Sequence, residues 1–167
     1  GGAFVAEIRA DVLAGRSQCA MHSLKDMPGN EETPGLVIGA YLKRENPTDS
    51  LVLRPGLTLE ELRRVEGEGL KLGTNSVRRG ALVRNLFPRI EVIHFRGAAD
   101  TRIDKLDYGK MQQQVDGSEV GPADAILLAT AGMARIGMAE RSDYRFSTDE
   151  MLPAVGQGIV AVECAET

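Results

Sequence analysis

The sequence predicts an α/β fold in which a parallel or mixed sheet is covered by helices. Apolar runs of strand length alternate with amphipathic helical stretches along most of the 167 residues. The composition, 43% hydrophobic and 26% charged, is that of a folded globular protein and excludes a disordered chain. No apolar run approaches the roughly 18 residues needed to span a membrane.

The order of elements follows from the apolar spacing and the turn residues. Phe4, Ile8 and Val12 recur at helical spacing and predict a first helix. Strands are expected at 18–22, 36–42, 70–74, 90–95, 123–130 and 158–164, with a short strand inside 46–56. Helices are expected at 57–65, 76–87, 100–109 and 131–138.

Local signals refine two of these helices and set one segment apart. Thr58 and Glu61 are spaced as a capping box at the start of a helix, and Pro88 closes the next one. Residues 111–122 are polar, include consecutive glutamines and show no apolar period. We expect this segment to be a mobile surface insertion.

The distribution of strands predicts an inserted central domain. Residues 42–145 contain a complete run of strands and helices, whereas 1–41 and 146–167 contain few strands of their own. We therefore expect 42–145 to form a second domain, with 1–41 and 146–167 as parts of the first.

Charge and cysteine content limit the partners. A net charge of −4 argues against a nucleic-acid-binding surface, so any basic site must be local. Cys19 and Cys164 lack C-x-x-C spacing, which predicts neither a zinc site nor a disulfide framework. We expect a cytoplasmic monomer with no metal and no membrane partner.

Three junctions between a strand and a helix carry chemically active side chains. In an open α/β sheet, ligands bind beyond the carboxyl ends of the strands, where helix N-termini favour anions. The junctions are His22–Asp26, Thr74–Arg79 and Arg96–Arg102.

Four arginines at two of the junctions indicate a ligand with several anionic groups. A single arginine would be solvated or paired with one of the many acidic residues. Guanidinium groups bind carboxylates and phosphates through two parallel hydrogen bonds, so a cluster favours a small polyanion. The four residues are Arg78, Arg79, Arg96 and Arg102.

The first junction is ambiguous alone. Lys25 and Asp26 could form a surface ion pair in a turn, but a carboxylate among cations could also stabilise positive charge developing on a substrate. His22 is expected to be a structural histidine with a satisfied partner. His94, inside the strand predicted at 90–95, is also expected to be structural.

Four motifs in order resemble porphobilinogen deaminase, also called hydroxymethylbilane synthase. They are "MHSLKDMP", "LGTNSVRRGALV", "FRGAADTRIDKL" and "LPAVGQGIVAVEC", and they follow the helix "GGAFVAEIRADVLAGR". Together they cover almost the whole chain apart from the insertion. The resemblance implies a two-domain clamshell like that of type II periplasmic binding proteins, with mixed sheets flanked by helices.

The resemblance also implies an activity and roles for particular residues. The family joins four porphobilinogen units, releases ammonia at each step, and builds the chain on a dipyrromethane cofactor attached to a cysteine. Asp26 matches the catalytic aspartate, which stabilises positive charge as ammonia leaves. Positions matching cofactor or substrate contacts are Ser23, Lys25, Thr74, Asn75, Ser76, Arg78, Arg79, Arg96, Gly97, Ala98, Arg102 and Gln157.

Departures from the family pattern concern the second and third junctions. Ala98 stands where the family has an asparagine, so one amide donor is missing. Asn75 replaces a serine, and its amide can still donate. Asp100 adds a negative charge near the arginines and is expected to cap the N-terminus of the following helix.

The resemblance implies an interior fragment that lacks the family's N-terminal strand and its third domain. The cysteine that holds the cofactor belongs to that third domain, so the chain alone is expected to be inactive. Two alternatives remain open from the sequence: a non-catalytic clamshell module for a small organic anion, and a LysR-type effector domain.

Overall fold

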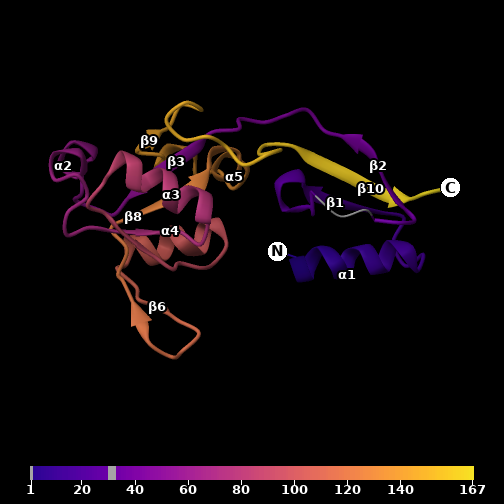
Figure 1. The fold of residues 1–167 in the computed structure, drawn as a ribbon, viewed down its shortest axis with the longest axis horizontal. Helices are drawn as coiled ribbons and strands as arrows, with labels where there is room; N and C mark the ends of the chain where they lie inside the picture. The colour runs from indigo at the N-terminus through magenta and orange to yellow at the C-terminus, as the bar shows by residue number, and fades with distance from the viewer. Residues whose placement is uncertain (1, 30–32) are drawn as a thin grey trace. The chain divides into compact units, whose positions relative to one another are not determined.

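The chain folds into two compact units, which are described separately. The computed structural model describes residues 2–29 and 33–167 (Figure 1). The small unit comprises Gly1–Pro47 and Ala154–Thr167, and the large unit comprises Thr48–Pro153. That these units correspond to the first two domains of the resembled family stays a prediction.

The large unit is built on a mixed five-stranded sheet with the order β5-β4-β8-β3-β9. Strand β4 runs parallel to β5 and β8, whereas β3 runs antiparallel to β8 and β9. The strands are β3 (Asp49–Leu53), β4 (Lys71–Gly73), β5 (Glu91–Ile93), β8 (Ala125–Ala129) and β9 (Tyr144–Arg145). The predicted mixed sheet flanked by helices is confirmed.

Helices cover both faces of this sheet because its central strands are apolar on both sides. In β3, Leu51 and Leu53 pack into one core cluster and Val52 into another. The first cluster includes Leu62 and Val83 from two helices, and the second includes Ile103 and Met133 from two others. The helices are α2 (Leu59–Arg64), α3 (Val77–Leu86), α4 (Ala99–Asp107), α5 (Thr130–Arg135) and the short η2 (Ala139–Arg141).

Helix caps agree with the local sequence signals in one helix and differ in another. The Thr58 hydroxyl accepts a hydrogen bond from the Glu61 backbone N–H at 3.1 Å, which confirms the expected N-cap of α2. The expected N-cap role of Asp100 is wrong. Ala98 is the N-cap of α4 and offers no side-chain cap, while Asp100 accepts from the Thr101 N–H within the first turn.

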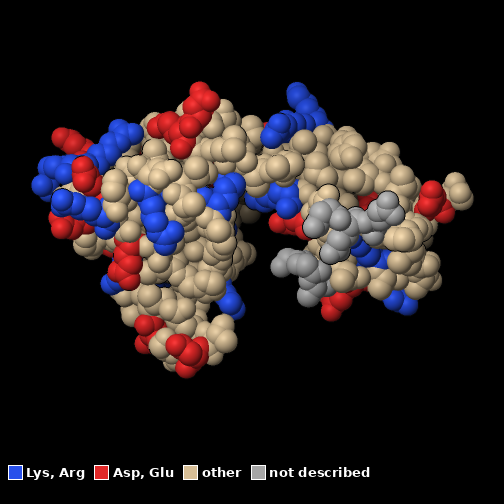
Figure 2. All heavy atoms as spheres, viewed as in Figure 1, with Lys and Arg blue, Asp and Glu red and all other residues tan. Residues whose placement is uncertain are grey.

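The polar insertion contains a short hairpin formed by β6 (Gln112–Gln113) and β7 (Glu119–Val120). Figure 2 shows acidic side chains at the tip of this hairpin, the part of the chain that carries Asp116. Gln112 is only 7% exposed, which the polar sequence did not predict.

No helix in the described part of the chain is long and apolar enough to cross a bilayer.

The small unit has an antiparallel sheet with the order β1-β10-β2, so its C-terminal strand lies in the centre. Its elements are α1 (Gly2–Leu13), β1 (Cys19–Ser23), the short η1 (Leu24–Asp26), β2 (Leu36–Tyr41) and β10 (Val160–Ala165). Helix α1 buries Val5 and Val12, whereas Phe4 is 66% exposed. The helical spacing was therefore correct, but the buried face is rotated from the one that begins at Phe4.

Gly73, the last residue of β4, has no room for a side chain. A Cβ added there would lie 2.6 Å from Cγ of Phe95, whose ring is buried. We expect Gly73→Ala to lower the free energy of unfolding by about 1–3 kcal/mol, because the ring must move in a close-packed core. Urea denaturation measures this.

Gly132 provides the matched control. It lies in helix α5, and a Cβ added there meets no heavy atom within 4 Å. Gly132→Ala is expected to leave stability unchanged or raise it by about 0.5–1 kcal/mol, because alanine favours the helix. Equal effects of the two substitutions would show that the Phe95 contact does not limit residue 73.

Candidate functional site

One edge of the large sheet collects the candidate residues. Strands β4, β5 and β8 are mutually parallel, so their carboxyl ends lie at the same edge. Strand β3 is antiparallel to β8 and therefore begins there, with Asp49 opposite Ala129. The junctions predicted after β4 and β5 thus meet the start of β3.

Asp49 is the acidic partner that the sequence analysis missed. It is fully buried, and Arg79 donates to its Oδ1 from Nε at 3.1 Å and from Nη2 at 2.7 Å. Arg78 donates from Nη1 to Asp49 Oδ2 at 2.9 Å and to the carbonyl of Leu152 at 2.5 Å. One carboxylate therefore holds two of the predicted arginines.

Arg102 lies near this pair without an acidic partner of its own in the described part of the chain. Its Nη1 donates a long hydrogen bond of 3.4 Å to the Leu127 carbonyl, and its buried Nε has no partner. Burial, and secondly the charge of Arg79, lower the pKa of Arg102 to about 10. The guanidinium is still protonated at neutral pH, so a buried donor remains for an anion.

Arg96 is exposed on the loop that follows β5. Its Nε donates to Nε2 of His94 at 3.1 Å, so this ring nitrogen acts as an acceptor. His94 lies beyond the end of β5 at Ile93, and the prediction that it sits inside the strand is wrong. The reason is that residue 95 leaves the ladder, and its N–H bonds to Asn75 Oδ1 at 2.8 Å.

The remaining residues of the two large-unit junctions shape the backbone. Thr74 Oγ1 accepts from the Ser76 N–H at 3.1 Å, and Ser76 Oγ accepts from the Arg79 N–H at 3.2 Å as the N-cap of α3. Gly97 has φ 130°, a conformation that favours glycine. Ala98 offers no side-chain cap to α4, and the Asp100 carboxylate accepts from the Thr101 N–H in the first turn.

The first predicted junction belongs to the small unit. Ser23 ends β1, and the exposed Lys25 and Asp26 form the short η1 turn. His22 is buried, with Nε2 placed 3.2 Å from Glu163 Oε1, and the expectation of a satisfied structural histidine is confirmed.

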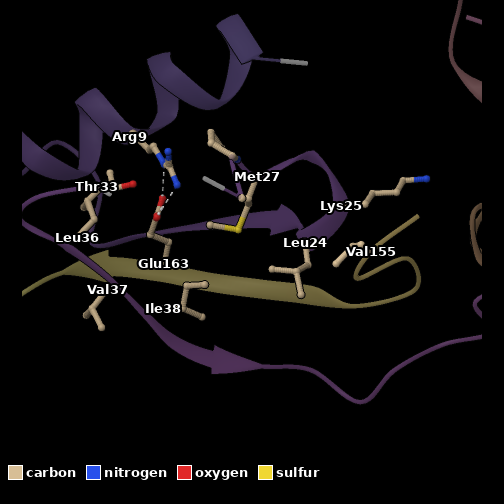
Figure 3. Close-up of a pocket in the computed structure, with 12 residues that line it drawn as sticks. Arg9, Leu24, Lys25, Met27, Thr33, Leu36, Val37, Ile38, Val155 and Glu163 are labelled. Atoms are coloured by element: carbon tan, nitrogen blue, oxygen red, sulfur yellow. Dashed lines mark hydrogen bonds and ion pairs between the residues drawn. The ribbon is translucent and has the colours of Figure 1, made fainter. Parts of the chain in front are cut away.

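A pocket of about 390 Å³ lies in the small unit beside this turn (Figure 3). The Arg9 guanidinium makes two 3.0 Å hydrogen bonds to the Glu163 carboxylate on its wall. Their charges offset each other, and Lys25 and apolar side chains such as Leu24 and Met27 line other parts of the wall. Arg9 is thus held by an acidic partner, whereas Arg102 has none in the described part of the chain.

Gln157 has the contacts of a structural link. It is 1% exposed, its Nε2 donates to the Pro47 carbonyl at 2.8 Å, and its Oε1 accepts from the Ala154 N–H at 3.3 Å. Arg44 also donates to its backbone carbonyl at 3.1 Å. Its assignment as a ligand-binding residue stays a prediction.

The structure thus brings Arg78, Arg79 and Arg102 together, with Arg96 on the neighbouring loop. That Asp26 of the small unit faces these arginines stays a prediction. Asp49 was missed because only antiparallel pairing, which joins residues 80 positions apart, brings it to this edge. The sequence feature that could have indicated Asp49 is its place as a single acidic residue at the start of an apolar strand.

Fold and site together define a class: a two-unit α/β protein with an arginine cluster at one edge of its larger sheet. A sulfonate-binding periplasmic protein, SsuA from Methylobacillus flagellatus, has a similar fold, with a TM-score of 0.51 and 13% identity. The likeness covers 98% of this chain and 47% of that chain. The family model described as "Porphobilinogen deaminase, dipyromethane cofactor binding domain" matches residues 1–167. The chain belongs to the porphobilinogen deaminase family.

Curated relatives agree with this assignment. Porphobilinogen deaminase 2 of Streptomyces coelicolor is 39% identical over 166 residues, and the porphobilinogen deaminase of Exiguobacterium sibiricum is 41% identical over 165 residues. The alignments cover 99% and 98% of this chain but 48% of each relative. The chain thus spans about half the length of these relatives.

Asp49 makes the arginine cluster compatible with a folded core. We expect Asp49→Asn to lower the free energy of unfolding by about 3–5 kcal/mol, because removing one partner leaves buried guanidinium charge uncompensated. Chemical denaturation measures the loss, and added phosphate should restore part of it by supplying a counter-anion.

Asp107→Asn is the control for this prediction. Asp107 also pairs with an arginine, Arg141, but the two side chains are 24% and 30% exposed. Its loss should cost at most about 1 kcal/mol, since solvent screens the pair. Similar losses for the two variants would contradict the role given to Asp49.

Proposed function

We propose that the complete protein is a hydroxymethylbilane synthase, which joins four porphobilinogen units and releases ammonia at each step. The observation that carries the proposal is the buried, unpartnered Nε of Arg102 beside Arg79. Each porphobilinogen carries an acetate and a propionate, and carboxylates match guanidinium groups through paired hydrogen bonds. The names of the 39–41% identical relatives support this choice of polyanion.

Charge balance explains why the site would favour such a substrate. In the described part of the chain, Arg78 and Arg79 share the carboxylate of Asp49, and Arg102 has no ion pair. A positive surplus in a partly dehydrated site attracts anions more strongly than one in bulk water. Arg96, exposed on the next loop, adds a further cation.

The same residues fit the carboxylates of dipyrromethane, the cofactor named by the family description. Arg102 offers an unsatisfied buried donor for one of these carboxylates. Arg79, Arg102 and the Ser76 hydroxyl would hold the cofactor. When bound, dipyrromethane supplies the anchor to which pyrrole units are joined. We propose no attachment role for Cys19 or Cys164, which lie opposite each other on β1 and β10.

Asp26 is proposed as the catalytic group. Its exposed carboxylate, in the η1 turn after β1, is available to accept hydrogen bonds from pyrrole N–H groups. As ammonia leaves, positive charge develops on the pyrrole, and a nearby fixed carboxylate lowers the energy of that state. Lys25 and Ser23 are proposed to orient the substrate beside it.

The setting proposed for this reaction is a cytoplasmic monomer that binds no nucleic acid and no membrane. The net charge of −4 and the two cysteines, both free, support this proposal.

Incubation of the complete gene product with porphobilinogen tests the function directly. Hydroxymethylbilane and ammonia are the expected products, and intact-mass spectrometry should show the added mass of covalent dipyrromethane. Failure to form hydroxymethylbilane in a protein that carries the adduct would refute the proposed activity.

Asp26→Ala separates catalysis from folding. Because the side chain is exposed, the free energy of unfolding should change by no more than about 0.5 kcal/mol. Turnover should fall by about 10²–10³-fold or more, since the lost carboxylate acts on developing charge. Steady-state kinetics and thermal denaturation check both halves, and near-normal turnover would remove Asp26 from the mechanism.

The lowered pKa of Arg102 predicts a pH dependence. Arg102 binds a carboxylate only when protonated, so KM for porphobilinogen should rise as pH passes its pKa of about 10. A rise of about tenfold corresponds to the loss of one charge-assisted hydrogen bond. Arg102→Gln should have a high KM already below pH 10, and its KM should show no further rise as pH passes 10. A step of equal size in the variant would assign the titration to another group.

A further inference from the structure

We propose that Gln112, in the polar insertion, is a positioning residue that sets the conformation of the loop carrying Arg96. The proposal rests on the proposed function, in which the Arg96 guanidinium binds a carboxylate of the substrate. Gln112 acts through the backbone of Arg96 and makes no contact with the ligand itself.

The loop needs partners from outside the sheet. Strand β5 ends at Ile93, so the backbone groups of the next residues leave the ladder and must bond elsewhere. The Arg96 N–H donates to Gln112 Oε1 at 3.0 Å, and the Arg96 carbonyl accepts from Lys105 Nζ at 2.9 Å. Side chains therefore fix the peptide groups on both sides of the Arg96 Cα.

Gln112 is itself held in one orientation. It is 7% exposed, its Oε1 also accepts from Lys105 Nζ at 2.9 Å, and its Nε2 donates to the Gln113 carbonyl at 2.8 Å. Lys105 Nζ also lies 5.5 Å from the centre of the buried Phe95 ring. Because the amide oxygen receives two donors and the amide nitrogen has an acceptor, rotation of this side chain would break all three bonds.

The hairpin holds the Arg96 loop through a residue at its base, and its tip takes no part in the proposal. Gln112 lies in β6, whereas acidic side chains occupy the tip, where Asp116 accepts from Ser118 (Figure 2). Negative charge at the tip offers no attraction for an anionic ligand. The side chain of Ala98, in the same loop as Arg96, carries no amide group. The hydrogen-bond acceptor for the Arg96 N–H comes instead from Gln112 in the inserted segment.

Amide hydrogen exchange in the 167-residue chain tests the structural half without any activity. In Gln112→Ala, exchange at the Arg96 N–H should accelerate at least about tenfold. Gln113→Ala is the matched control, since Gln113 is the exposed neighbour in the same strand and its bond to Gln112 uses the backbone carbonyl, which alanine keeps. Gln112→Glu keeps an acceptor oxygen and should retain protection. Gln112→Met, which keeps the volume without an acceptor, replaces the alanine variant if that variant fails to fold.

Kinetics of the complete protein test the functional half. Gln112→Ala should raise KM for porphobilinogen about tenfold and leave kcat within about twofold, because the loop affects binding of a carboxylate. Gln113→Ala should match the wild type. If Gln112 acts through Arg96, the double variant with Arg96→Ala should be no worse than Arg96→Ala alone.

The outcomes separate the two proposals. Wild-type kinetics in Arg96→Ala would overturn the binding role of Arg96, and with it the positioning role. Impairment in Arg96→Ala with unchanged kinetics or unchanged Arg96 exchange in Gln112→Ala would overturn the positioning role alone. Additive losses in the double variant would likewise overturn it, since they would show that Gln112 acts independently of Arg96.

Discussion

The buried carboxylate of Asp49 is the constraint on which the candidate site depends. A charge without solvent must be paired, and Arg78 and Arg79 both donate hydrogen bonds to this carboxylate. The dependence is mutual, because without Asp49 the guanidinium of Arg79, itself 8% exposed, would be an uncompensated buried charge. One carboxylate neutralises only one of the two guanidinium groups, and Arg102 adds another positive charge. The cationic surplus is therefore part of the fold.

The same edge shows how side chains outside the motif around Arg96 shape the loop that carries it. The motif around Arg96 determines which cations are present, but the path of its backbone depends on Asn75 and Gln112. These two amides come from different elements and accept from successive N–H groups. A sequence motif therefore specifies the chemistry of this site more completely than its geometry.

Local patterns in the sequence were sufficient for much of the fold. Apolar runs predicted the strands and their alternation with helices, and the side chain of Thr58 predicted a cap, because neighbouring residues determine these features. Asp49 and Gln112 could not be placed in this way, since antiparallel pairing and the packing of a hairpin bring distant segments together. For Asp100, the sequence predicted the helix start correctly only to within two residues. The true N-cap is Ala98, and the Asp100 carboxylate accepts from an N–H group within the first turn instead.

The central place of β10 in the small sheet determines the order in which the chain can fold on the ribosome. Strands β1 and β2 both pair with β10, which is synthesised more than 100 residues after them. The large unit is continuous in sequence, so the five strands of its main sheet are synthesised before the strands of the small unit can pair. Strands β1 and β2 therefore stay unpaired until β10 has been synthesised. The backbone N–H and C=O groups of unpaired strands can pair with strands of other chains. Translation speed and chaperone supply should accordingly affect the yield of the small unit more than that of the large one.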